Sequence, residues 1–436
     1  MSAEKEQVKV LKGKRLIDGN GGEPVQNAVM VIEGQRIKEV GSEGKVTVPA
    51  GAEVIDMGDC TLMPGLIDCH MHPPHSKARF FRNMRVASYE VFPQLQELYA
   101  LFHVQFCLEH GFTSLRDGAN ADMYGECSTP MMVAVREAIN NGLFAGPRIL
   151  VGGLTVHTNS HLAHPSSYVR VSPDLTADGP WEMRKLARRQ LRMQADFIKT
   201  CASGGGGTAG EEPDVVNMTQ EELDAVADEA HAFGKQCVCH CFTPLSQKKA
   251  VRAGVDTIEH CVFTDDEAVA MMKEANKPLI PTLAHRTDRE IAEWRDAGMP
   301  EFTTNKLKRI QPYCWETFKK IHKAGIKIAM GTDAGLDSGL YEIEIYVSLG
   351  MTPMEALQTA TKNAAEAIWL GNDTGTLDVG KYADVIAING DPLQNIKVFQ
   401  DRNNTMLVMK EGTVHIDKRK GHEKSVIQNW NWKIID

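Results

Sequence analysis

The sequence predicts an α/β fold: a (β/α)8 barrel of the TIM type with a small β-sandwich domain formed from both termini. The first observation is the length, because 436 residues accommodate a barrel of about 250 residues and an accessory domain. The second is a long middle in which strand-like and helix-like runs alternate, as in parallel βαβ units. The third is that both ends carry short apolar runs separated by Gly, Asn and Pro, which is typical of β-structure.

The β-like runs at the two ends indicate one small domain assembled from segments far apart in the sequence. Trp430 and Trp432 near the C-terminus indicate a tail that docks on the protein or forms an oligomer contact. The strand candidates at the ends span residues 8–17, 28–33, 36–41, 53–56, 383–388 and 405–410. The expected divisions are a small β domain at 1–60 plus 372–420, the barrel at 61–371, and a C-terminal tail at 421–436.

The middle supplies enough strands to close a barrel. Amphipathic helical runs separate them, such as 219–233 and 303–324. Thr219 followed by Glu222 is the signature of a capping box and predicts a helix start there. The eight strand candidates span residues 61–70, 112–117, 148–156, 196–202, 236–242, 257–261, 278–284 and 326–333.

Composition excludes several classes of protein. The net charge of 48 − 57 = −9 lacks the basic surface that a nucleic-acid binder needs. No apolar run approaches the ~20 residues needed to span a bilayer, and residues 1–9 lack the apolar stretch of an export signal. We therefore expect a cytoplasmic protein that acts on a small molecule. Alternation places Cys237, Cys239 and Cys241 on one strand face, where we expect buried free thiols against the helices.

Metal-ligand residue types recur where the predicted strands end, which is where such barrels carry their active sites. His70 and His72 end the first strand and share its barrel-facing side, so both imidazoles can reach one metal. His240 and His260 end the fifth and sixth strands. Asp333 closes the eighth strand, where a carboxylate can bind a metal and accept a proton.

Lys199 completes this set of six candidate ligands. It lies in the fourth strand, within Phe197-Ile198-Lys199-Thr200, which should be buried on both faces. A lysine there is costly unless it is paired or modified. Burial lowers the pKa of a lysine, and the neutral amine reacts with CO2. We therefore expect a carbamate on Lys199 that bridges two divalent metals, most simply zinc, with cobalt, manganese or nickel also compatible with nitrogen and oxygen ligands.

Substrate contacts are expected from the loops that follow the strands. The loop after the third strand contains His157, His161 and His164, and the last two are candidates to line the substrate site. His285, just past the seventh strand, is a candidate donor to the substrate carbonyl or tetrahedral oxygen. Arg286, which follows it, and Arg116 near the end of the second strand are weaker candidates to meet a carboxylate.

The chain resembles the amidohydrolase superfamily over nearly its full length. The resemblance rests on Pro64-Gly65-Leu66-Ile67-Asp68-Cys69-His70-Met71-His72, the lysine strand, the two single histidines, Gly331-Thr332-Asp333-Ala334-Gly335 and the C-terminal stretch with Gly380-Lys381-Tyr382-Ala383-Asp384-Val385. Ile198-Lys199 before Ala202-Ser203-Gly204-Gly205-Gly206, and Gly254-Val255-Asp256-Thr257-Ile258-Glu259-His260, look like one branch of it. That branch holds prolidase-like, imidazolonepropionase-related enzymes and hydrolases of aryl amides, ureas and thiocarbamates.

The resemblance implies a role for each ligand. His70 and His72 would bind the more buried metal with Asp333, His240 and His260 would bind the other, and Lys199 would bridge them. One position departs from the pattern. Many relatives carry His-Ala-Tyr where this chain has His240-Cys241-Phe242, so Phe242 faces the substrate without a hydroxyl to donate. The resemblance also implies a homo-oligomer.

These residues predict a binuclear hydrolase of an amide-like C–N bond, in an N-acyl amino acid, dipeptide, aryl amide, urea or carbamate. A metal-bridging water would give its proton to Asp333, attack the polarised carbonyl carbon as hydroxide, and leave Asp333 to protonate the departing nitrogen. One alternative is a mononuclear deaminase of a ring amine, but such enzymes lack the lysine and usually carry a glutamate three residues after the histidine of the fifth strand. Another is a catalytically inactive scaffold, which should have lost ligands that are all present here.

Overall fold

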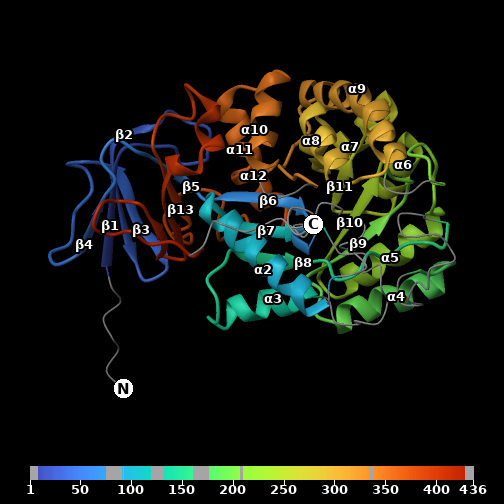
Figure 1. Cartoon of the computed structure of the whole chain (residues 1–436), viewed down its shortest axis with the longest axis horizontal. Helices are drawn as coiled ribbons and strands as arrows, with labels where there is room; N and C mark the ends of the chain where they lie inside the picture. Colours follow the sequence, from blue (N-terminus) through green and yellow to red (C-terminus); the bar gives the residue numbers. More distant parts are fainter. Residues whose placement is uncertain are drawn as a thin grey trace.

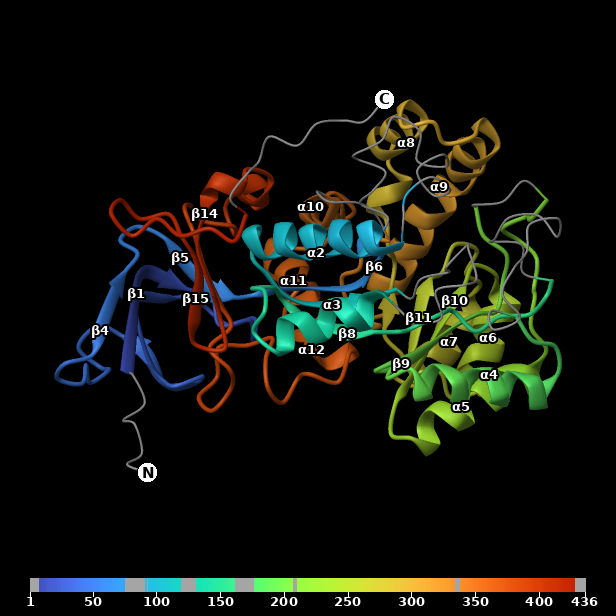
Figure 2. The same ribbon diagram turned by 60° about the horizontal axis from the view of Figure 1, so that its bottom comes forward.

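The computed structural model of the chain describes residues 8–74, 91, 93–118, 131–160, 176–206, 210–333 and 338–427. Within them, a sheet built from both ends of the chain lies beside a ring of parallel strands covered by helices (Figure 1). The blue and red segments at the left of Figure 1 form the sheet, and the turned view in Figure 2 keeps the two parts side by side. The chain therefore has the α/β barrel fold with a terminal β domain that its sequence predicts.

The terminal sheet runs in the order β15-β14-β13-β5-β1-β2-β3, with β4 paired to β1. Its N-terminal strands alternate with turns as the apolar runs indicate, whereas β15 has no counterpart among the strands that the sequence predicts. The strands are β1 (Val8–Leu16), β2 (Val25–Glu33), β3 (Arg36–Ser42), β4 (Glu53–Asp56), β5 (Thr61–Pro64), β13 (Val385–Ile388), β14 (Thr405–Lys410) and β15 (Thr413–Asp417).

The single strand predicted over 61–70 is in fact two strands that belong to different sheets. β5 pairs with β1 and β13 in the terminal sheet, while β6 (Leu66–Met71) pairs with β7 in the barrel. Gly65 lies at the junction, where an added Cβ would stand 2.1 Å from Oγ1 of Thr113. Only a residue without a side chain allows the chain to pass from one sheet to the other this close to β7.

The barrel consists of two groups of parallel strands joined by single bridges. One group is β6-β7-β8 and the other is β9-β10-β11-β12. Val156 bridges to Thr200 of β9, and Leu279 of β12 bridges to Ile328. The amide of Cys69 donates to the carbonyl of Met330 at 2.9 Å, which closes the ring. The strands are β7 (Phe112–Asp117), β8 (Arg148–Val151), β9 (Phe197–Cys201), β10 (Gln236–Cys241), β11 (Thr257–His260) and β12 (Leu279–Ile280).

The eighth predicted strand, residues 326–333, holds its place in the ring without a regular ladder. It makes the one bridge at Ile328, and its last residues bond to the end of β6 instead of continuing beside it. The amides of Thr332 and Asp333 both donate to the carbonyl of His70, at 3.0 and 2.6 Å. The eighth strand therefore ends turned toward the residues that end the first one.

Helices cover the outside of the ring, and the helix predicted from Thr219 is confirmed. The Thr219 side chain accepts from the Glu222 amide, and the Glu222 side chain accepts from the Thr219 amide. The helices are α2 (Pro93–Glu109), α3 (Met131–Asn140), α4 (Pro180–Arg192), α5 (Gln220–Ala232), α6 (Pro244–Arg252), α7 (Asp266–Glu274), α8 (Asp288–Asp296), α9 (Glu301–Lys323), α10 (Ser338–Ser348), α11 (Pro353–Thr359) and α12 (Lys362–Ala367), with 3-10 turns η2 (Ala284–Arg286), η3 (Ile396–Gln400) and η4 (Arg402–Asn404).

The thiols of β10 are buried and free, as the alternation predicts: Cys237, Cys239 and Cys241 form no disulfide. Near the C-terminus, the carboxylate of Glu109 on α2 accepts the amides of Val426 and Ile427 at 2.7 and 3.2 Å. This contact ties residues after β15 to the barrel, whereas the two tail tryptophans lie outside the described residues. Among the described helices, none is both long and apolar enough to cross a membrane.

The capping box of α5 provides a test of the local fold. Replacing Thr219 by Ala removes the side-chain oxygen that accepts the Glu222 amide, so we expect a loss of about 1 kcal/mol in the free energy of unfolding. Thermal or urea unfolding measures this loss. Because Thr219 contacts none of the candidate metal ligands within the described residues, the expected hydrolytic activity of the folded variant should match the parent, and a large loss of activity would contradict this account.

Candidate metal centre

Asp333 lies at the centre of the candidate site, with histidines on several sides. Its Oδ1 is 3.1 Å from Nε2 of His72 and 3.6 Å from Nε2 of His70, both at the end of β6. Its Oδ2 is 3.8 Å from Nδ1 of His260, at the end of β11, and 3.6 Å from Nδ1 of His285 in η2. The structure therefore brings one carboxylate and four imidazoles from separate barrel segments to one place.

His240 extends this group from the neighbouring strand. Its ring centroid lies 4.5 Å from that of His260, which in turn lies 4.9 Å from that of His70. His240 is the last residue but one of β10, and its register places it beside Cys201 of β9 and Glu259 of β11. The four histidines predicted as ligands thus form a connected group on strands β6, β10 and β11.

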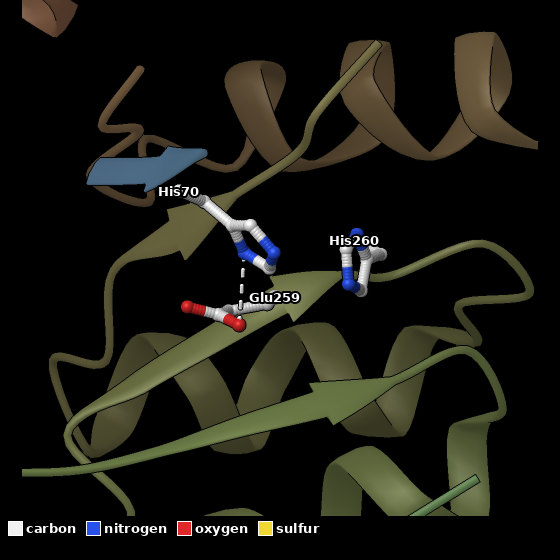
Figure 3. Close-up of side chains that lie close together, drawn as sticks. All are labelled: His70, Glu259 and His260. Atoms are coloured by element: carbon white, nitrogen blue, oxygen red, sulfur yellow. Dashed lines mark ion pairs between the residues drawn. The ribbon is translucent and has the colours of Figure 1, made fainter. Parts of the chain in front are cut away.

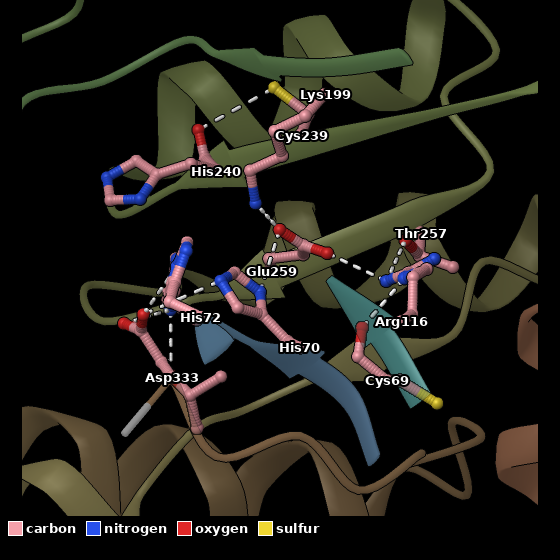
Figure 4. A network of polar contacts seen from close by, with 12 residues as sticks. Cys69, His70, His72, Arg116, Lys199, Cys239, His240, Thr257, Glu259 and Asp333 are labelled. Atoms are coloured by element: carbon pink, nitrogen blue, oxygen red, sulfur yellow. Dashed lines mark hydrogen bonds and ion pairs between the residues drawn. The ribbon is translucent and has the colours of Figure 1, made fainter. Parts of the chain in front are cut away.

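Lys199 enters the site from β9 and contacts a residue that the sequence analysis did not select. Its Nζ is in contact with Oε2 of Glu259, the residue before His260 (Figure 4). The same Oε2 lies 2.9 Å from Nδ1 of His70. Figure 3 marks this contact with a dashed line and shows His260 beside it. The other oxygen of Glu259 accepts from Nη2 of Arg116 at 2.7 Å. Glu259 therefore lies between three nitrogen-bearing side chains.

Three of the four candidate imidazoles contact a second residue through one ring nitrogen, which favours the other nitrogen as the metal ligand. Nδ1 of His260 lies 2.7 Å from Oγ1 of Thr282, and Nε2 of His240 lies 3.0 Å from the carbonyl of Gly204. Nδ1 of His70 faces Glu259. Such partners fix ring orientation and tautomer in metal sites. They leave Nε2 of His70, Nε2 of His260 and Nδ1 of His240 as the ligand atoms.

Burial determines the charge of these groups. Burial lowers the pKa of His70 and of His260 well below the ordinary imidazole value, so both rings are neutral and able to bind a metal. Burial also lowers the pKa of Lys199 to about 8. Burial alone would raise the pKa of Asp333, but the nearby imidazole of His285 and the hydrogen bond from His72 outweigh it and hold that pKa well below its usual range. Asp333 is therefore a carboxylate.

Backbone conformation at the site is strained. Four residues other than glycine adopt the left-handed region: His260 (φ 70°), Cys261 (φ 53°), Thr282 (φ 51°) and Asp333 (φ 53°). Each follows a barrel strand, and three of them carry side chains of the site. Such conformations cost of order 1–3 kcal/mol each and are found preferentially at functional sites. Nearby, Gly118 lacks a Cβ that would stand 2.8 Å from the rings of both His70 and His72.

Three predicted substrate-facing residues lie beside this group. Phe242 stacks on His240 with ring centroids 4.3 Å apart and meets His260 edge-on at 5.3 Å. His285 stacks on Trp294, and burial lowers its pKa to about 4. Arg286, which follows it, is fully buried. His161 and His164, the other two candidates, lie outside the described residues.

Two residues missed from the sequence have clear structural signals. Glu259 is buried at the centre of the network in Figure 4, although its position next to His260 gave it no separate signal in the sequence. Asp117 ends β7 and is also buried, and among the described residues neither of its oxygens has a hydrogen-bond partner. Burial raises the pKa of Asp117 to about 7. Its place at a strand end was the signal that could have identified it.

The donor set suits a divalent cation. Two groups of side chains have ligand atoms within 4.8 Å of one another: His70 with His72 and Asp333, and His70 with Glu259 and His260. Neutral imidazoles and carboxylate oxygens are the ligands that zinc and similar metals prefer. The described residues therefore include groups of histidines and carboxylates that could hold a metal ion.

Comparison with known proteins identifies the family of the chain. The Amidohydrolase family model matches residues 61–415. Ochratoxinase from Aspergillus niger is 30% identical over 94% of this chain and 87% of its own length. A solved Xaa-Pro dipeptidase with bound methionine in its active site is 30% identical, with a TM-score of 0.85 over 94% of this chain and 99% of that one. A prolidase solved with N-methylphosphonate-L-proline is 28% identical, with a TM-score of 0.81 over 94% and 99%. The chain therefore belongs to the amidohydrolase family and is a hydrolase of carbon–nitrogen bonds.

Proposed function

We propose that this protein is a binuclear metal-dependent hydrolase that cleaves an amide-like C–N bond. The observation that carries the proposal is the convergence of His70, His72 and His260 on the carboxylate of Asp333 at distances of 3.1 to 3.8 Å. These residues come from three different barrel strands. A hydrolase of this type needs a ring of ligands around a carboxylate that can also accept a proton.

The ligands divide into two sets. His70, His72 and Asp333, whose ligand atoms lie close together, would hold one cation. His240 and His260, with ring centroids 4.5 Å apart, would hold the second. When bound, two divalent cations, most simply zinc, lower the pKa of water and polarise a substrate carbonyl.

In this proposal Lys199 joins the two sets. It lies on β9, beside β10, and its Nζ reaches the same carboxylate oxygen as His70. We propose that CO2 adds to this amine and that the resulting carbamate bridges the two cations. A carbamate supplies two oxygen atoms and a negative charge, whereas an ammonium in this position would repel both metals.

Asp333 is the proposed proton carrier. Its low pKa keeps it ionised before reaction, so it can accept a proton from water. It then delivers that proton to the departing nitrogen, without which an amine leaves poorly. His285, 3.6 Å from Oδ2 of Asp333 and neutral at pH 7 because of burial, is the proposed donor to the substrate oxygen in place of the hydroxyl that Phe242 lacks.

Metal content and a substrate panel together test the proposal. Protein purified without chelator should contain about two zinc-like ions per chain, as a bridged binuclear site requires, and should hydrolyse a member of a panel of N-acyl amino acids, dipeptides, aryl amides and aryl ureas. A single ion with release of ammonia from a ring amine would instead identify a mononuclear deaminase. Metal-loaded protein without activity on either class would support an inactive scaffold.

Replacing Lys199 by Ala tests the bridge. We expect the variant to lose most of its metal and activity, because two cations would repel each other without the anionic oxygens between them. Elemental analysis after dialysis measures the metal, and circular dichroism monitors the fold. Normal binding of two metals by Lys199→Ala would exclude the carbamate.

Replacing Asp333 by Asn tests the proton carrier. An amide oxygen can still bind a metal, but it cannot accept a proton at neutral pH, so turnover should fall by about 100-fold or more while much of the metal is retained. Steady-state kinetics on the zinc-loaded variant measure the change. Turnover equal to that of the parent would remove Asp333 from this role.

Replacing Glu259 by Gln tests how His70 is oriented. The carboxylate accepts from Arg116 at one oxygen and faces His70 at the other, whereas an amide has one acceptor and must turn its NH2 toward one of these two groups. We expect metal affinity to fall about 10- to 100-fold, measured by chelator competition. Glu229→Gln, on the outer helix α5, is a matched control that should leave the affinity unchanged.

A further inference from the structure

Arg286 is a buried cation beside the metal centre that the proposed reaction does not use. It closes η2, directly after His285, and none of its side chain is exposed. Its guanidinium carbon lies 5.4 Å from the centroid of Phe242, the ring that stacks on His240. A guanidinium in such a position keeps its charge, and a buried charge is normally paired with an opposite one.

Within the described residues, only one side-chain nitrogen of Arg286 has hydrogen-bond partners. Nη1 donates to Oγ1 of Thr282 at 2.7 Å and also to the carbonyl of that residue. Nε and Nη2 are buried, and within the described residues neither has a hydrogen-bond partner. In the same part of the chain no carboxylate pairs with Arg286, whereas Arg116, the other fully buried arginine, has Glu259 at 2.7 Å. One edge of Arg286 therefore lacks an anion.

Arg286 is joined to the cluster of candidate metal ligands through its other terminal nitrogen, Nη1. The hydroxyl of Thr282 that accepts from Arg286 also lies 2.7 Å from Nδ1 of His260. Thus a single hydroxyl separates the guanidinium from a candidate ligand. Phe242 contacts both groups, since its ring meets His260 at 5.3 Å.

We propose that the Nε and Nη2 edge of Arg286 binds a carboxylate of the substrate, and that this selects N-acyl amino acids or dipeptides over uncharged aryl amides, ureas and carbamates. This inference rests on the proposed hydrolysis of a C–N bond at the same site. The fork of a guanidinium matches the two oxygens of a carboxylate. A bound carboxylate would supply the missing opposite charge and two acceptors for the buried nitrogens.

The dimensions of such substrates suit this arrangement. In an N-acyl amino acid, the carboxylate is attached to the carbon that carries the scissile nitrogen, and it lies within about 4 Å of the carbonyl carbon. Two hydrogen bonds of 2.7 Å through the hydroxyl of Thr282 join Nδ1 of His260 to Nη1 of Arg286, so a substrate acid held near His260 would direct its carboxylate toward the side of the ring that carries Nδ1. Uncharged substrates would leave the guanidinium buried without a partner, which is unfavourable.

Matched pairs of substrates test the inference. The zinc-loaded protein is assayed with N-acetylleucine, N-acetylphenylalanine and N-acetylproline, each beside the N-acetyl amine in which hydrogen replaces the carboxyl group. We expect kcat/KM to favour the acid by about 100-fold in at least one pair, and Arg286→Gln to remove most of that preference while changing the amine by no more than about 3-fold. Arg286→Lys should keep only part of the preference for acids, because an ammonium group lacks the paired N–H donors of a guanidinium. Arg295→Gln, an exposed arginine on α8, is the matched control.

A binding measurement keeps this test separate from the proposed reaction. Calorimetry on the zinc-loaded Asp333→Asn protein compares the acid and amine of each pair, with and without Arg286→Gln. Tighter binding of acids that depends on Arg286 supports the carboxylate site even if no pair is hydrolysed, in which case the proposed function alone fails. The inference would be overturned if acids and amines were hydrolysed and bound equally well. It would also be overturned if the preference for acids persisted in Arg286→Gln. In both cases the proposed C–N hydrolysis would be unaffected.

Discussion

The buried carboxylate of Glu259 is the interaction on which the barrel interior depends. Arg116 and Lys199 bring two basic groups into a buried region, and a nearby opposite charge offsets the cost of taking them out of water. Glu259 contacts both of them and His70 as well. These four side chains come from β7, β9, β11 and β6, so one carboxylate joins strands from both halves of the ring. Glu259 therefore balances buried charge in the core and also orients His70, a candidate metal ligand.

A second carboxylate joins the first and eighth strands at the point where the ladder stops. Asp68 accepts the amide of His70 at 2.9 Å and the hydroxyl of Thr332 at 2.8 Å. Burial raises the pKa of Asp68 to about 7. Beside it, the carbonyl of His70 accepts the amide of Asp333. Because side-chain and carbonyl bonds replace the regular strand pairing here, the backbone can turn Asp333 toward the histidines in a conformation that a strand would forbid.

The sequence predicted the barrel, the terminal β domain and the six candidate ligands because each depends on a local pattern. Alternation sets which residues face inward, and strand ends set where ligands gather. The change of sheet at Gly65 could not be predicted in this way, since an unbroken apolar run gives no sign that its two halves pair with different partners. Glu259 was missed for a related reason. Its partner Arg116 lies 143 residues away, and only the closed ring brings the two together.

Phe242 shows how a departure from the family pattern changes what the site can recognise. Without a hydroxyl, its ring cannot donate a hydrogen bond to a substrate oxygen. The ring instead contacts two imidazoles and a guanidinium: His240 stacks on it at 4.3 Å, His260 meets it edge-on at 5.3 Å and Arg286 approaches it at 5.4 Å. An aromatic ring attracts a guanidinium through its face and excludes water around it. Phe242 therefore contacts both the candidate metal ligands and the buried cation. A polar residue in place of Phe242 would hydrate the guanidinium of Arg286 and weaken its attraction for an anion. The site therefore lacks a hydrogen-bond donor beside the metal ligands, but it keeps Arg286 next to an aromatic ring.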